Sequence, residues 1–63
     1  MNFTKDEWML LILYGKDTLS DTIASMQKVK KKLQPDETEL DRMLNGMIRK
    51  LQSMTEAEFA KLG

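Results

Sequence analysis

The same helix-start phrase occurs three times in this 63-residue chain, at residues 3–8, 35–40 and 54–59. Each copy has a residue that can cap a helix, a Glu three residues later, and apolar residues directly outside and after this pair. The pattern is that of a capping box with a hydrophobic staple. In such a box the cap oxygen accepts from the amide of the Glu, and the Glu carboxylate accepts from the amide of the cap. The capping residues are Thr4, Asp36 and Thr55. Three helix starts are therefore predicted at these places.

Apolar spacing and stop signals complete a prediction of four helices. They are expected over residues 5–14, 18–33, 36–52 and 56–62. Gly15 is predicted to end the first helix in a left-handed conformation, and Thr18 or Asp17 to cap the second. Pro35 should end the second helix, because the residue before a proline avoids the helical region. The expected fold class is all-α: a single domain over residues 1–63, formed by a small compact bundle of three main helices plus a short C-terminal fourth helix. Because the links are short, sequential helices should be antiparallel neighbours.

The third predicted helix contains Gly46, which costs about 1 kcal/mol relative to Ala in a helix interior. Its apolar phase nevertheless continues past the glycine, from Leu40 to Met54. We therefore predict one helix in which Gly46 permits close packing, with a break at Gly46 as the alternative.

The first predicted helix is apolar on every side over residues 8–14. A helix of this kind is normally buried on all sides, which is difficult in a chain that buries only about 60% of its surface. Either the other helices wrap it, or a face formed by Met9, Leu10 and Leu13 mediates self-association or binds a partner protein. The core is predicted to comprise Trp8, Leu11, Ile12, Ile23, Met26, Leu33, Leu40, Leu44, Met47, Leu51 and Phe59.

Composition narrows the classes of function. The chain has no Cys and no His, so disulfides and an ordinary zinc site are excluded. Stability must then come from helix packing, a partner copy, or both. The longest apolar run, residues 8–14, is short against the roughly 20 residues that span a bilayer. A cytoplasmic protein with no membrane partner is expected.

Catalysis is not expected. General acid–base chemistry at neutral pH usually uses His, or a carboxylate or Lys with a shifted pKa in a cleft. The acids here lie mostly in predicted first helical turns, and the glycines are too isolated to cradle a phosphate. We therefore predict no enzyme activity, no catalytic residue, no cofactor, no metal and no small-molecule ligand.

A lysine-rich stretch, residues 28–32, is the best candidate for contact with nucleic acid. The candidate patch consists of Lys28, Lys30, Lys31, Lys32, Arg49 and Lys50. Three observations oppose it. Cations are favoured at a helix end, the acids of residues 36–41 could pair with the lysines, and no aromatic residue lies among them to stack on bases. Zero net charge also argues against a generic nucleic-acid binder.

The order of these sequence motifs along the chain resembles the order in a known family. The matching pieces are Phe3, Thr4 and Glu7; Leu11, Ile12 and Tyr14; Leu33 and Pro35; and the stretches 36–40 and 50–59. They are similar to small proteins encoded on mobile elements of Gram-positive, mostly clostridial, bacteria and described as putative transposon-transfer assisting proteins. The most specific part is the Asp-Glu-x-Glu-Leu phrase followed by the Met-Thr-Glu-x-Glu-Phe phrase. The lysines of residues 28–32 are not part of this pattern.

The resemblance implies an accessory role in the transfer of a conjugative transposon. We expect a non-enzymatic interaction protein whose partner is another protein of the transfer apparatus or a second copy of itself. The alternative is a small DNA-binding accessory factor that uses the Lys28–Lys32 patch.

Overall fold

The structure of the protein is a computed structural model that describes residues 3–62. This range contains four helices. They are α1 (Lys5–Tyr14), α2 (Leu19–Lys31), α3 (Thr38–Gln52) and α4 (Glu56–Ala60). No strand occurs within residues 3–62. The expected fold class, three main helices plus a short fourth, is confirmed. None of the helices in this range is long and apolar enough to cross a membrane.

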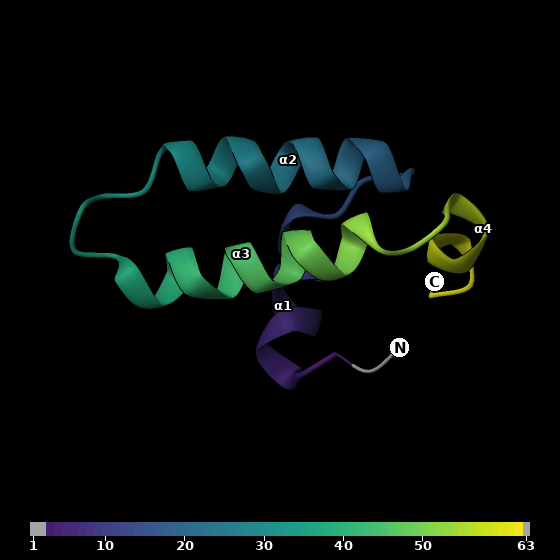
Figure 1. Cartoon of the computed structure of the whole chain (residues 1–63), viewed down its shortest axis with the longest axis horizontal. Coiled ribbons are helices and arrows are strands. Elements are labelled where there is room, and N and C mark those ends of the chain that lie inside the picture. The colour runs from purple at the N-terminus through teal and green to yellow at the C-terminus, as the bar shows by residue number, and fades with distance from the viewer. Residues whose placement is uncertain (1–2, 63) are drawn as a thin grey trace.

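Helices α2 and α3 lie side by side as an antiparallel hairpin, and α1 lies across both of them (Figure 1). The short α4 packs near the beginning of α2, so the two are neighbours although the whole of α3 separates them in sequence. Sequential helices were expected to be antiparallel neighbours, and this holds for α2 and α3. Helix α1 instead crosses the hairpin.

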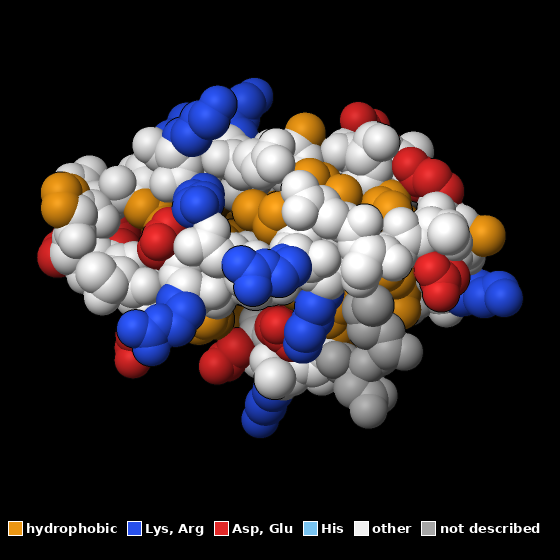
Figure 2. All heavy atoms as spheres, viewed as in Figure 1, with side chains coloured by type: hydrophobic (Ala, Val, Ile, Leu, Met, Phe, Trp, Pro, Cys, Tyr) orange, Lys and Arg blue, Asp and Glu red, His pale blue; other side chains and the backbone are white. Residues whose placement is uncertain are grey.

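The centre of the core lies between α2 and α3. Met26, Leu44, Met47 and Leu51 are completely buried there, as predicted. In the view of Figure 2, hydrophobic side chains show mainly in the seam between these two helices. The remaining buried apolar side chains, which the sequence prediction did not include, are Leu10, Leu19, Ile48 and Met54.

Two predicted core residues, Trp8 and Ile12, are exposed, with 38% and 80% of their surfaces accessible. This part of the prediction is wrong, because α1 turns its opposite side towards the hairpin. The other five predicted core residues are half-buried and pack against the core. They are Leu11, Ile23, Leu33, Leu40 and Phe59.

Threonine caps begin three of the four helices. Thr4 accepts from the Glu7 amide at 3.2 Å and donates its own amide to the Glu7 carboxylate at 2.8 Å, which confirms the first capping box. Thr55 forms the same reciprocal pair with Glu58. Thr18, one of the two predicted caps of α2, accepts from an amide of the first turn at 3.1 Å.

The predicted cap at Asp36 is wrong. Helix α3 begins at Thr38, and Glu37 precedes it without a side-chain capping bond. The Glu37 carboxylate instead accepts from the Gln34 amide at 2.9 Å, while the Glu37 amide donates to the Gln34 carbonyl at 3.0 Å. These two bonds close a turn around Pro35, so the helix starts two residues later than predicted.

Two glycines differ from their predicted roles. Gly15 has φ −65° and ψ 150°, an extended conformation rather than a left-handed one. Glycine is required there by proximity, since a Cβ atom would lie 2.3 Å from the Leu11 carbonyl oxygen. At Gly46, α3 is continuous as predicted. A Cβ there would meet only the Glu7 carboxylate, at 4.0 Å, so close packing does not demand glycine.

Candidate interaction site on helix α1

The buried side of α1 is defined by Glu7 and Leu10, which are 8% and 4% exposed. Phe3, Leu11 and Tyr14 lie half-buried against the core. A carboxylate at such a position needs partners, because burying a charge without compensation is costly. No buried side-chain nitrogen or oxygen within residues 3–62 lacks a hydrogen-bond partner.

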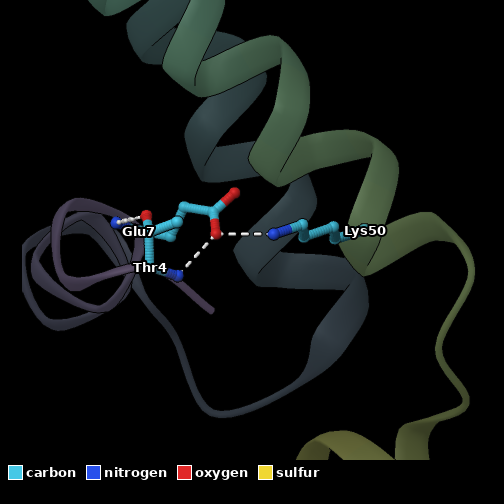
Figure 3. Close-up of polar contacts among 3 residues, drawn as sticks. All are labelled: Thr4, Glu7 and Lys50. Carbon is cyan, nitrogen blue, oxygen red and sulfur yellow. Dashed lines mark hydrogen bonds and ion pairs between the residues drawn. The ribbon is translucent and has the colours of Figure 1, made fainter. Parts of the chain in front are cut away.

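The partner of Glu7 is Lys50 of α3, whose Nζ lies 2.6 Å from Glu7 Oε1 (Figure 3). The same oxygen accepts from the Thr4 amide, so one carboxylate closes the capping box and joins α1 to α3. Burial raises the pKa of Glu7, but the hydrogen bond and charge of Lys50 and the hydrogen bonds from Thr4 outweigh it. The pKa therefore lies below its ordinary value of 4.5.

Aromatic packing supports this junction. The Phe3 and Trp8 rings meet edge to face with centroids 5.1 Å apart, which is the predicted hydrophobic staple. Lys50 Nζ lies 5.7 Å from the Phe3 ring centroid, within the range of a cation–π contact. These contacts fix which side of α1 faces the hairpin.

The opposite side of α1 is apolar and exposed. Its surface consists of Ile12 (80% exposed), Leu13 (64%), Met9 (54%) and Trp8 (38%), and we call these four residues the α1 face. Met9 and Leu13 were predicted to lie on such a surface. Leu10 was predicted there too, and this is corrected, because its side chain is in the core.

The sequence divides α1 into two sides but does not show which of them is buried. Met9, Ile12 and Leu13 have i, i+3, i+4 spacing and so share one side of a helix. Glu7, Leu10 and Tyr14 share the other side by the same rule. The apolar pattern alone does not say which of these two sides is buried.

A groove of about 480 Å³ borders the α1 face and is lined by residues of α1, of the link that follows it, and of the C-terminal segment from Phe59 to Leu62. Trp8 and Ile12 form one wall, and Phe59 and Leu62 belong to the other. Lys16 and Asp17, in the link after α1, also line the groove. The complete lining is Trp8, Leu11, Ile12, Gly15, Lys16, Asp17, Phe59, Ala60 and Leu62.

The predicted nucleic-acid residues do not form one patch. Lys28, Lys31 and Lys32 are exposed at the end of α2, where Figure 2 shows Lys and Arg side chains gathered, and Lys30 is half-buried beside them. Because α2 and α3 are antiparallel, Arg49 and Lys50 lie towards the other end of the hairpin. Lys50 is also engaged with Glu7.

The lysines at the end of α2 are not neutralised by the start of α3. Among residues 3–62 the Lys50–Glu7 contact is the ion pair that the structure records, and the acids of residues 36–41 pair with none of the lysines. The ion pairs that were expected between the lysine run and these acids are therefore not formed among the described residues.

Residues 3–62 contain no cluster of side chains arranged as a metal centre. Within the described residues, no group of three or more Asp or Glu side chains is placed to hold a metal ion, and the chain has no His or Cys.

Comparison with known proteins identifies a family. The family model described as "Putative transposon-transfer assisting protein" matches residues 3–63, nearly the whole chain. No curated protein and no solved structure matches it. The matched range includes every residue of the α1 face.

Proposed function

We propose that this chain, which belongs to the family of putative transposon-transfer assisting proteins, is a non-enzymatic accessory protein of a conjugative transposon. In this proposal it assists transfer by binding another protein of the transfer apparatus in the cytoplasm. The binding surface is the α1 face. The family description supports the role in transfer, and the surface supports the mode of action.

The observation that carries the proposal is the size of this exposed apolar surface. The four residues together expose about 470 Å², if each has roughly 200 Å² of accessible surface when free. This is about a tenth of the 4681 Å² of the whole protein. Contiguous apolar patches of several hundred Å² on a small protein commonly mark interaction sites.

The α1 face is also held rigidly. Helix α1 is fixed from behind by Leu10 in the core and by Glu7 bound to both Thr4 and Lys50. A surface that is already ordered before binding loses less conformational entropy on association. Partner binding therefore needs no rearrangement of α1.

The test substitutes exposed residues only. Met9→Lys and Leu13→Lys place charges on the α1 face, and Gln27→Lys places the same charge on an exposed position of α2. We expect the α1 substitutions to reduce the transfer frequency of the element at least tenfold, whereas Gln27→Lys leaves it unchanged. A photo-crosslinking residue at position 13, but not at position 27, should capture a protein encoded by the element. If both α1 variants fold and support normal transfer, the proposal is wrong.

DNA binding is a second candidate, favoured by the lysines at the end of α2, which form no ion pair with any other residue of the range 3–62. Its test is an amide-resolved NMR titration with a short duplex at low and at high salt. Shifts confined to residues 28–32 that disappear with salt would support it, because neutralised phosphates release counterions. Insensitivity of partner binding to salt, with sensitivity to Leu13→Lys, would instead support the protein-partner mode.

A further inference from the structure

We infer that the α1 face also pairs with itself: two copies of this chain associate through it, with their α1 helices antiparallel across a two-fold axis. The inference rests on the proposed function only in treating this face as a protein-binding surface. It adds that a second copy of this chain occupies the α1 face and that this occupancy regulates binding of the partner. Self-association and the transfer partner would compete for the same residues, so the free protein would hold its apolar surface covered until the partner displaces the second copy.

The shape of the surface suits a symmetric pair. A two-fold interface uses the same patch on both copies, so the patch must be complementary to itself. Here a ridge formed by Met9 and Leu13 runs beside the groove whose walls include Trp8 and Phe59. Ile12 is 80% exposed and borders both ridge and groove, so two antiparallel copies place ridge against ridge and groove against groove around their Ile12 side chains.

The area is adequate for a weak dimer. The α1 face supplies about 470 Å², and the half-buried groove residues with the stems of flanking lysines extend this towards the roughly 800 Å² per partner of a standard interface. Interfaces below the standard size belong mostly to weak, transient complexes, so we expect a dissociation constant on the order of micromolar or weaker. Such a dimer would form at moderate concentration and remain exchangeable.

Charge decides the orientation of the two helices. Lys5 and Asp6 lie exposed at one end of α1, and Lys16 and Asp17 lie exposed just beyond the other. An antiparallel pair with Met9 opposite Leu13 of the second copy brings the start of one α1, with Lys5 and Asp6, beside the link that follows the other α1, with Lys16 and Asp17. Lys5 can then meet Asp17, and Asp6 can meet Lys16. Each contact occurs twice by symmetry. A parallel pair would instead bring identical charges together.

Overall charge does not oppose the association, since each copy has a net charge of zero. Individual exposed ion pairs contribute little stability. They therefore set the orientation and register of the two helices, while the apolar residues supply most of the affinity.

The experiment is sedimentation velocity on the purified full chain, from micromolar to near-millimolar concentration, with circular dichroism to verify folding. The wild type is expected to rise from the monomer mass of 7.3 kDa towards twice that value. Ile12→Lys should remain monomeric throughout, and Gln27→Lys should behave like the wild type. Lys5→Asp or Asp17→Lys alone should weaken association roughly five-fold or more, and the two together should restore it.

Two results would overturn the inference. One is a wild type that stays at 7.3 kDa at the highest concentration. The other is a double charge-reversed variant whose two losses add instead of cancelling. Either result leaves the transfer assay unaffected: a monomeric wild type whose transfer is still lowered by Leu13→Lys would refute self-association alone. A dimer whose α1 variants transfer normally would refute the proposed partner binding.

Discussion

Glu7 is the residue that most directly determines how α1 lies on the hairpin, and its charge should make stability depend on pH. Its pKa in the folded state is below 4.5, so the unfolded chain binds the proton more readily. The stabilisation is thus complete above the unfolded pKa and is lost as pH falls through the lower, folded value. We expect the free energy of unfolding of the wild type to decrease in this acidic window.

Glu7→Gln should flatten that decrease and lower stability at neutral pH by about 1–2 kcal/mol, because a charged acceptor with several donors is replaced by a neutral one. Urea unfolding at a series of pH values measures both effects. The matched control is Glu39→Gln, because Glu39 is an exposed acid in the first turn of α3 whose side chain has no partner among residues 3–62. An equally steep acid dependence in Glu7→Gln would mean that other groups are responsible.

Gly15, which follows α1, and Gly46, in the interior of α3, should respond oppositely to substitution by alanine. Gly15→Ala would force a Cβ atom to within 2.3 Å of the Leu11 oxygen and disturb the 2.7 Å hydrogen bond between the Gly15 amide and that oxygen. We expect a loss of about 1–3 kcal/mol. Gly46→Ala, which meets nothing closer than 4.0 Å, should add about 0.5–1 kcal/mol by improving helix propensity. Thermal unfolding of both variants tests the contrast, and a stabilised Gly15→Ala would contradict it.

At the level of elements, α4 contributes to the fold by capping α2. The Glu56 carboxylate accepts from the Leu19 amide at 2.8 Å and from the Ser20 amide at 3.3 Å. These amides belong to the first turn of α2 and have no partner inside the helix. Glu56→Ala should therefore cost about 0.5–1 kcal/mol and speed hydrogen exchange at residues 19 and 20. Glu39→Ala is again the control, and unchanged exchange in Glu56→Ala would show that α4 does not cap α2 in solution.

Features fixed by neighbouring residues were predictable from the sequence, and features fixed by distant ones were not. The caps at Thr4, Thr18 and Thr55 depend on residues three positions away, and all three are present. The cap at Asp36 failed although it is also local, because Glu37 is used by the turn around Pro35. Glu56 caps α2 by accepting from Leu19, which is 37 positions away in the sequence, and no sequence pattern predicts this contact.

The rotation of α1 shows the same limit for the candidate site. Both sides of this helix are apolar, so hydrophobic periodicity could not choose between them. The choice is made by the contact between Glu7 and Lys50, which are 43 residues apart. As a result, Met9 and Leu13 are exposed, as in one of the two alternatives left open for this helix, whereas the expected positions of Leu10 and Ile12 were reversed.

For the molecule as a whole, the helices pack on one small core cluster. Leu10 and Leu13 of α1 should therefore differ sharply in their effect on folding, because only Leu10 belongs to this cluster. A chain of this length is stable by only about 3–9 kcal/mol. Leu10 is 4% exposed and lies in the same cluster as Met26 and Leu44, whereas Leu13 is 64% exposed. Leu10→Ala should cost about 2–4 kcal/mol by leaving a cavity, and Leu13→Ala no more than about 0.5 kcal/mol.

The two substitutions remove the same atoms, so their difference measures burial alone. Urea unfolding followed by circular dichroism gives both free energies. Equal losses would mean that α1 is rotated relative to the structure or detached from the hairpin. The expected contrast also fixes how the α1 face can be studied: substitutions at residues 9, 12 and 13 report on binding, while any change at Leu10 reports on folding.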